Sequence, residues 1–98
     1  MNVPERGDVI ILDGRPALVI SPANFNRVFS LAFVAPITSK PKGHAFEIPL
    51  PKGSSVSGAV MVHQLKSLDW RARRAERSGK VSGDVVARAA EIIAEIVR

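Results

Sequence analysis

Residues 7–21 read GDVIILDGRPALVIS, two short apolar runs separated by the dipeptide Asp13-Gly14. Asp-Gly between apolar runs is a strong signal for a two-residue hairpin turn, because both central residues of such a turn need a positive φ. We therefore expect a β-hairpin with strands at residues 7–12 and 15–21. Pro16 lies near the start of the second strand, where a missing N–H is tolerated.

More strands are expected after this hairpin. A connection that is irregular or one helical turn long leads to a strand at residues 28–34, which is apolar on both faces and should be central. Pro36 is expected to end that strand. The remaining predictions are strands at residues 44–50 and 58–65, a helical turn or bend at 68–74, and a short strand or loop at 76–80.

The C-terminal residues 83–97 have the pattern of an amphipathic helix, with apolar residues recurring every three or four positions. Ser82 is suited to the N-cap position, and Asp84 lies in the first turn, where negative charge is favourable. Several antiparallel strands in so short a chain usually curl into a small barrel. We therefore expect a mainly β fold with a C-terminal helix, forming a single domain over residues 1–98 with its strands between about residues 7 and 80.

The composition narrows the function classes. The 98 residues include no cysteine, which excludes a disulfide scaffold, a cysteine-ligated zinc site and a cysteine nucleophile. No apolar run approaches the roughly 20 residues that a membrane-spanning helix needs. The N-terminus has no signal-peptide pattern, so we expect a cytoplasmic protein without a membrane partner. The net charge of +5 is compatible with a nucleic-acid partner and equally with an acidic protein partner.

Metal chemistry is not expected. The two histidines, His44 and His63, fall on different predicted strands, and no acidic cluster accompanies them. The sequence also lacks a Walker loop, a GxSxG motif and a GxGxxG motif. We therefore predict no metal and no cofactor.

Three polar segments could bind an anion, and each also has a purely structural explanation. Gly14-Arg15-Pro16 would hold a guanidinium at a strand start, either as an ordinary surface arginine or as a fixed phosphate ligand. Pro36–Lys40 supplies two hydroxyls and an amine after the central strand, either as a polar loop or as an anion site. Lys66–Lys80 is a basic run that could bind single-stranded RNA or be a solvated surface. Its tryptophan, Trp70, is more consistent with core packing, because the chain has few other aromatic residues.

Several segments, in the same order along nearly the whole chain, resemble the MazF/PemK (CcdB-like) family of toxin endoribonucleases from type II toxin–antitoxin modules. The segments are ERGDVI at 5–10, GRPALVISPANFN at 14–26, VAPITS at 34–39, KGHAFEIPL at 42–50 and GAVMVHQLKSLDWRAR at 58–73, followed by the terminal helix. The series RPALVxSP, P-x-T and QxKSxDWRAR is the specific part of the resemblance.

This resemblance implies a small SH3-like β-barrel of the CcdB/MazF-like toxin fold, assembled as a homodimer. It implies a sequence-specific endoribonuclease that cleaves single-stranded RNA without metal, by attack of the RNA 2′-hydroxyl, leaving 2′,3′-cyclic phosphate and 5′-hydroxyl ends. It also implies a cognate antitoxin whose acidic tail blocks the site, with DNA contacted only through that antitoxin. The alternative is an inactive RNA- or antitoxin-binding module on the same fold, acting in regulation of its operon.

By the same resemblance, Arg15 and Thr38 match the family's catalytic arginine and threonine. A fixed guanidinium and a hydroxyl can stabilise the negative charge that builds up on phosphorus during cleavage. A guanidinium is a poor base at neutral pH, so we assign Arg15 to charge stabilisation and proton donation, and Thr38 to holding the phosphate. The predicted RNA contacts are Ser39, Lys40, Lys66 and Gln64, the last of which matches a family glutamine.

The chain departs from the family pattern just before Gln64. His63 stands where some members have an acidic residue or asparagine. We hypothesise that His63 contacts RNA or acts as the base, since imidazole exchanges protons near neutral pH. The competing interpretation is a spacer that only changes base preference. His44 stands where relatives often have tyrosine, and it is assigned no role.

A second departure concerns the connection between the first two strands. Relatives usually place a longer loop there, which contributes RNA contacts, whereas Leu12-Asp13-Gly14-Arg15 joins the strands directly. Either the protein has lost this loop, or a mobile segment is missing from the sequence. A true loss would put RNA affinity and cleavage in doubt.

Overall fold

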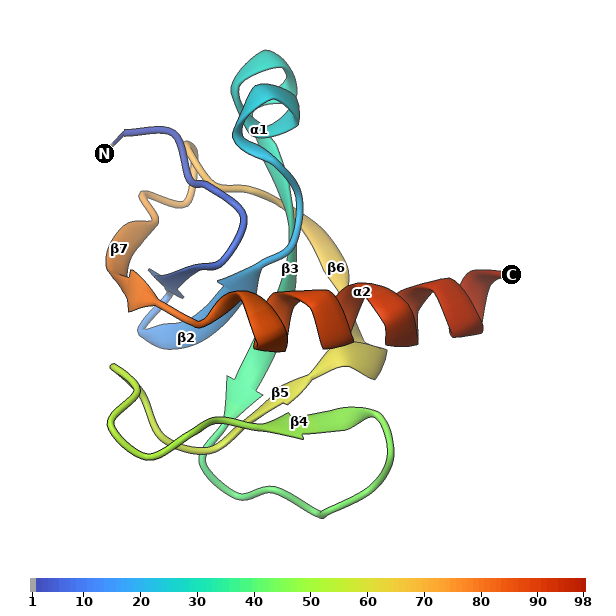
Figure 1. The fold of residues 1–98 in the computed structure, drawn as a ribbon. Coiled ribbons are helices and arrows are strands. Elements are labelled where there is room, and N and C mark those ends of the chain that lie inside the picture. Colours follow the sequence, from blue (N-terminus) through green and yellow to red (C-terminus); the bar gives the residue numbers. More distant parts are fainter. Residues whose placement is uncertain (1) are drawn as a thin grey trace.

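The computed structural model describes residues 2–98, in which seven strands alternate with two α-helices and one 3₁₀ turn (Figure 1). The elements in chain order are β1 (Asp8–Leu12), β2 (Arg15–Val19), α1 (Ala23–Phe29), β3 (Leu31–Thr38), β4 (Glu47–Pro49), β5 (Ala59–Met61), the 3₁₀ turn η1 (Val62–Gln64), β6 (Lys66–Asp69), β7 (Glu76–Lys80) and α2 (Gly83–Val97). In Figure 1, α1 lies at one end of β3 and the β4–β5 hairpin at the other. None of the helices in this range combines the length and the apolar character that crossing a bilayer requires.

All strand pairs are antiparallel and belong to one seven-stranded sheet. Its order is β4-β5-β3-β2-β1-β7, and β6 also pairs with β3. The long strand β3 is central, as predicted: it pairs with β2 along one edge and with β6 and then β5 along the other. The mainly β fold with a C-terminal helix is confirmed. The sheet does not close into the predicted barrel, because within residues 2–98 the end strands β4 and β7 each pair with a single neighbour.

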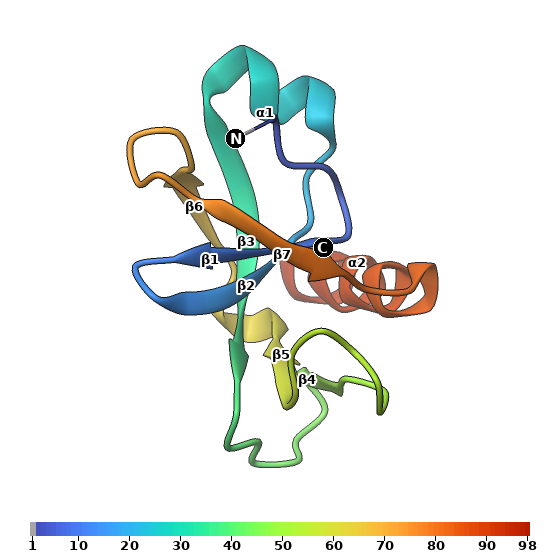
Figure 2. The same ribbon diagram turned by 90° about the vertical axis from the view of Figure 1, so that its left-hand side faces the viewer.

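The two faces of the sheet have separate apolar clusters. On the helix face, which α2 covers, Leu18 and Ala35 pack with apolar residues of α2. On the opposite face, Ala17 and Val34 pack with Trp70. Because side chains alternate along a strand, neighbours such as Ala17 and Leu18 enter different clusters. Figure 2 shows α2 on one side of β3 and the tip of the β1–β2 hairpin projecting on the other.

The helix α2 spans Gly83–Val97, as the apolar periodicity predicts. Its buried residues are Val85, Val86, Ala89 and Ile92, which face the sheet. Ser82 occupies the N-cap position, but its side chain makes no capping hydrogen bond. The Val85 N–H instead donates to the Ser82 carbonyl (3.2 Å), so the cap uses backbone groups only.

The segment 28–34, predicted as one strand, belongs to two elements. Val28 and Phe29 form the last turn of α1, and Ser30 ends the helix with a left-handed backbone (φ 56°). Strand β3 then begins at Leu31. A short apolar run fits helix and strand equally well, and the turn at Ser30 divides this one.

The prediction that Pro36 ends the central strand is wrong, since β3 continues to Thr38. The Phe33 backbone groups face the β2 edge, where the carbonyl accepts the Ile20 N–H (2.8 Å). By alternation, the Pro36 nitrogen faces the other edge. On that edge β3 pairs with β6 as far as Val34 and with β5 from Ile37 onward. No ladder hydrogen bond therefore requires the N–H that proline lacks.

Two further strands are shorter than predicted. Residues 44–46 turn before β4, with the Glu47 N–H bonded to the His44 carbonyl (3.1 Å). β5 ends at Met61, so His63 and Gln64 lie on η1 rather than on a strand. The ambiguous segments resolve into strand β6, a turn over residues 70–74, and strand β7.

Candidate functional site

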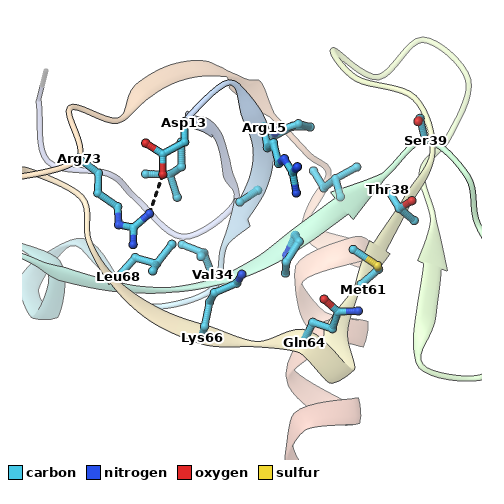
Figure 3. Close-up of a pocket in the computed structure, with 15 residues that line it drawn as sticks. Asp13, Arg15, Val34, Thr38, Ser39, Met61, Gln64, Lys66, Leu68 and Arg73 are labelled. Atoms are coloured by element: carbon cyan, nitrogen blue, oxygen red, sulfur yellow. Dashed lines mark hydrogen bonds and ion pairs between the residues drawn. The ribbon is translucent and has the colours of Figure 1, made fainter.

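A groove of about 690 Å³ opens on the face of the sheet opposite α2, here called the groove face (Figure 3). Its floor is apolar and comprises Leu12, Ala17, Val34 and Leu68, which belong to or pack on the Trp70 cluster. Its polar lining residues are Asp13, Arg15, Thr38, Ser39, Gln64, Lys66 and Arg73. The structure thus brings together Arg15, Thr38, Ser39, Gln64 and Lys66 from the site predicted by sequence.

Strand register places Arg15 opposite Thr38. In the β2–β3 ladder Ala17 faces Pro36, and the strands are antiparallel. Arg15 is two residues before Ala17, and Thr38 is two residues after Pro36. The two therefore lie across from each other on the same face of the sheet. Figure 3 shows the Arg15 side chain extending over the groove from the start of β2, with Thr38 at the far end of β3.

Arg15 is exposed and has no acidic partner among residues 2–98. It follows the tight turn at Asp13 and Gly14, both of which have positive φ (52° and 79°), as the sequence predicts. The hairpin fixes the start of the side chain, and no hydrogen bond or ion pair to another residue of the described range 2–98 occupies the guanidinium donors. Such a group is suited to an anionic ligand.

The Thr38 hydroxyl is oriented by the loop that follows β3. Thr38 Oγ1 accepts the Lys40 N–H (3.1 Å), so the hydroxyl hydrogen remains available to a ligand. Ser39 lies beside it on the groove lining. Lys40 contributes this backbone contact, but its side chain is not part of the lining.

The other wall of the groove comes from η1 and β6. Lys66 pairs with Val34 across β3 and β6, and Gln64 lies at the end of η1. Both side chains are exposed and point toward the space beneath Arg15 in Figure 3. The ammonium of Lys66 has no acidic partner among the described residues.

One end of the groove is closed by an ion pair that sequence reasoning missed. Arg73 Nη1 lies 2.6 Å from Asp13 Oδ2, although the two residues are 60 positions apart. In the sequence, Arg73 is one residue of a basic run and Asp13 is a turn residue, and neither pattern indicates this contact. With Arg15, Lys66 and Arg73 against Asp13, the groove has an excess of positive charge that attracts a polyanion.

The basic run Lys66–Lys80 is not one continuous RNA platform. Trp70 is buried (3% exposed) and its Nε1–H donates to the Asn26 carbonyl (3.0 Å), so the packing explanation for this tryptophan is confirmed. Arg77 and Lys80 turn toward the buried Asp8, at 2.9 and 3.5 Å. Only the part of the run near β6 and Arg73 faces the groove.

The two histidines, predicted on different strands, lie on neither: His44 is in the loop before β4 and His63 is on η1. Their rings meet edge to face with centroids 4.7 Å apart, and His44 Nε2 lies 3.6 Å from Glu47 Oε2. His63 is exposed and does not line the groove, although Gln64 beside it does. Within residues 2–98, no three His, Asp or Glu side chains are placed to hold a metal ion.

Glu47 is held beneath these rings by backbone donors. Its Oε1 accepts the N–H groups of Gly43 (2.8 Å) and Lys42 (2.9 Å), while its side chain is only 4% exposed. The Gly43 hydrogen bond has the largest effect on the pKa of Glu47 and outweighs the opposite effect of burial. Together with the Lys42 hydrogen bond and the two nearby histidines, it lowers the pKa of Glu47 below its ordinary value.

The chain is similar to one known protein family over nearly its whole length. Residues 1–97 match the family described as PemK-like, MazF-like toxin of type II toxin–antitoxin system. The match therefore covers all the elements that build the groove.

Two curated relatives come from Escherichia coli strain K12. Endoribonuclease toxin MazF is 35% identical over 91 residues, covering 82% of this chain and 81% of the relative. Endoribonuclease toxin ChpB is 35% identical over 98 residues, covering 84% of each.

Solved structures from Deinococcus radiodurans are similar over nearly their whole length. A MazE–MazF crystal structure (form III) matches with a TM-score of 0.93 and 42% identity, covering 97% of this chain and 96% of that chain. A MazF crystal structure (form I) matches with a TM-score of 0.92 and 38% identity, at the same coverage.

Proposed function

The chain belongs to the family of PemK-like, MazF-like toxins of type II toxin–antitoxin systems and is a toxin endoribonuclease of the MazF type, and we propose that it cuts single-stranded RNA in the groove. The observation that supports this site most directly is the position of Arg15 opposite Thr38, on a face where the guanidinium has no acidic partner among residues 2–98. A phosphate is the ligand that such a cation and hydroxyl bind together. Residues 1–98 then act as one domain.

The proposed reaction needs no metal ion. The 2′-oxygen of the RNA loses its proton and bonds to the adjacent phosphorus, while the bond from phosphorus to the next 5′-oxygen breaks. The products are a 2′,3′-cyclic phosphate and a 5′-hydroxyl. Arg15 stabilises the extra negative charge on phosphorus, and such stabilisation by a fixed donor is a large catalytic contribution. Arg15 also donates a proton to the leaving 5′-oxygen.

The other groove residues bind the RNA in this proposal. The Thr38 hydroxyl, oriented by the Lys40 N–H, donates to a phosphate oxygen. Lys66, Ser39 and Gln64 contact the backbone and bases on either side, since phosphate contacts position a nucleic acid and base contacts specify its sequence. Lys40 supplies charge at the rim.

His63 is the candidate considered for the group that accepts the 2′-proton. His63 stands next to Gln64 but outside the groove lining, which favours an RNA contact over the role of base. If His63→Ala leaves the cleavage rate and its pH profile unchanged, His63 is not the base.

The proposal extends to partners and location. Three of the similar solved structures pair MazF with MazE, and a MazE-like antitoxin is the protein partner we expect for this basic chain. A homodimer in the cytoplasm, with DNA contacted only through the antitoxin, completes the proposal.

The test is cleavage of a long single-stranded RNA in EDTA by the wild type, by Arg15→Ala and by Arg27→Ala. Arg27 is an exposed arginine on α1 and serves as the matched control. We expect discrete cuts with cyclic-phosphate ends from the wild type and the control. Loss of an oxyanion-type donor should reduce the rate of Arg15→Ala by on the order of a hundred-fold or more.

The same experiment distinguishes the proposed nuclease from the alternative function. The two-residue turn at Asp13 and Gly14, in place of the family's longer loop, favours an inactive binding module that regulates its operon. That function predicts RNA bound without any cut. Cleavage that requires added metal, or that survives Arg15→Ala, contradicts the proposed mechanism.

A further inference from the structure

A group of aromatic rings lies just outside the groove and has no role in the mechanism above. Phe46 is 42% exposed, which is unusual for so apolar a side chain, and the His44 ring lies 6.2 Å from it. His63 completes the group by meeting His44 edge to face. We call His44, Phe46 and His63 the ring cluster.

Strand pairing places Glu47, the carboxylate beside His44 of the ring cluster, on the groove face. Thr38 faces Ala59 across β3 and β5, and Met61, two residues on, faces Glu47 across β5 and β4. Side chains that face each other or lie two residues apart point to the same side, so Thr38, Met61 and Glu47 share one face. Two strand spacings separate Thr38 from Glu47, or on the order of 10 Å.

The ring cluster is held in place before any ligand arrives. The Phe46 N–H donates to His44 Nδ1 (3.2 Å), which leaves His44 Nε2 directed at Glu47. Glu47 is itself fixed by two backbone N–H groups. The Val62 N–H donates to the Phe46 carbonyl (3.1 Å), which ties the loop to η1 and therefore to His63. A ligand that contacts these rings does not need to order them first.

We propose that the ring cluster is a stacking site for one nucleobase of the RNA, adjacent to the nucleotides in the groove; this rests on the proposed function. Exposed aromatic rings are the standard platform for unpaired bases, because every base has a π-face. The groove supplies cations for the phosphates, and Gln64 connects it to His63. A strand held by its phosphates in the groove therefore presents its next bases to these rings.

The probe is an RNA oligonucleotide that carries the mapped cut sequence, with a 2′-deoxy nucleotide at the attacking position so that it binds without being cut. Each flanking nucleotide is replaced in turn by an abasic one, and dissociation constants are measured. For the wild type we expect one flanking position at which removal of the base weakens binding about ten-fold, the effect of one stacked base.

The matched variants are Phe46→Ala, Phe46→Leu and Phe46→Trp, with Phe29→Ala as control. Phe29 is also a strongly exposed phenylalanine (60%), but it lies on α1 at the other end of β3 (Figure 1). We expect Phe46→Ala and Phe46→Leu to bind the intact RNA about ten-fold more weakly and to lose sensitivity to the abasic position. Phe46→Trp should keep both, and Phe29→Ala should behave as the wild type.

The outcomes distinguish this proposal from the function on which it rests. If the wild type cuts RNA but Phe46→Leu shows the wild-type abasic pattern, the stacking proposal is overturned and the nuclease function stands. If no abasic position weakens binding to the wild type, the stacking proposal is also overturned, and a protein partner becomes the ligand to test for these rings. If the wild type neither cuts nor binds RNA, both proposals fail together.

Discussion

The two faces of the sheet are built from the same strands but serve different purposes. On the helix face, Leu18 and Ala35 are fully buried against α2. On the groove face, Arg15 and Lys66 are exposed and lack acidic partners within residues 2–98. Burial of apolar area provides most of the folding free energy, so stability should depend on the buried residues on both faces and RNA cleavage on the exposed polar residues of the groove face. Substitutions under α2 should therefore leave cleavage per folded molecule unchanged, and substitutions of exposed groove side chains should leave stability nearly unchanged.

The largest expected effect is on the helix face. Ile92 lies on the buried side of α2 and is 1% exposed, and Ile92→Ala should lower the free energy of unfolding by about 2–5 kcal/mol, through lost burial and a cavity. Cleavage per folded molecule should not change. Ile96→Ala, on the same helix but at a 50% exposed residue, is the control and should cost far less. Denaturant unfolding measures the two losses of stability, and equal losses would contradict the burial of Ile92. A fall in cleavage per folded molecule would contradict the division between the faces.

Thr38→Val tests the groove face. Valine keeps the shape of threonine but removes the hydroxyl that the Lys40 N–H orients. We expect single-turnover cleavage to slow by roughly ten- to a hundred-fold, since one donor to the phosphate is lost, with thermal unfolding nearly unchanged. Thr38→Ser restores a hydroxyl and should retain most of the activity. A fully active valine variant would show that Thr38 only shapes the groove.

A smaller effect is expected at Glu47, where the groove face includes a buried charge. Its folded-state pKa is lowered from 4.5, so the carboxylate stabilises the fold above that pH and the contribution is lost as the pH falls through the folded value. Glu47→Gln should be less stable than the wild type near neutral pH. Its melting temperature should then fall less between about pH 7 and pH 3. Parallel melting curves for the two proteins over this range would disprove the assignment.

The smallest effect on stability is expected at the Asp13–Arg73 ion pair, which is largely exposed. Asp13→Asn should change the free energy of unfolding by less than about 1 kcal/mol, because Asn-Gly forms the same turn. It frees the Arg73 guanidinium for RNA. Binding of the uncleavable RNA should tighten at low salt, and its log–log salt dependence should steepen by up to about one unit. Unchanged salt dependence would mean that Arg73 does not face the RNA.

Local patterns predicted some elements well and others badly. The α2 periodicity and the Asp13-Gly14 turn are local signals, and both elements form where expected. The run at residues 28–34 is apolar on all sides, so its pattern does not specify helix or strand. A proline inside a strand usually marks the end of that strand, so the sequence predicts an end at Pro36. Pro36 fits inside β3 because β3 changes partner there, which the sequence does not reveal.

The site was partly predictable for a similar reason. The family resemblance supplied Arg15 and Thr38, and alternation along paired strands explains why they share a face. The contact between His44 and His63 depends instead on the loop before β4 and the 3₁₀ turn after β5. Neither was expected, because both segments were predicted to be strands.

The burial of Trp70 also makes the protein easy to monitor. The chain has one tryptophan and no tyrosine, so its ultraviolet fluorescence comes essentially from a single indole in the apolar cluster under the groove. Folding surrounds that indole with Ile10, Ala17 and Val34, and unfolding exposes it to water, which shifts its emission to longer wavelength. One emission spectrum, recorded on the sample used for a cleavage assay, therefore reports whether a variant is folded.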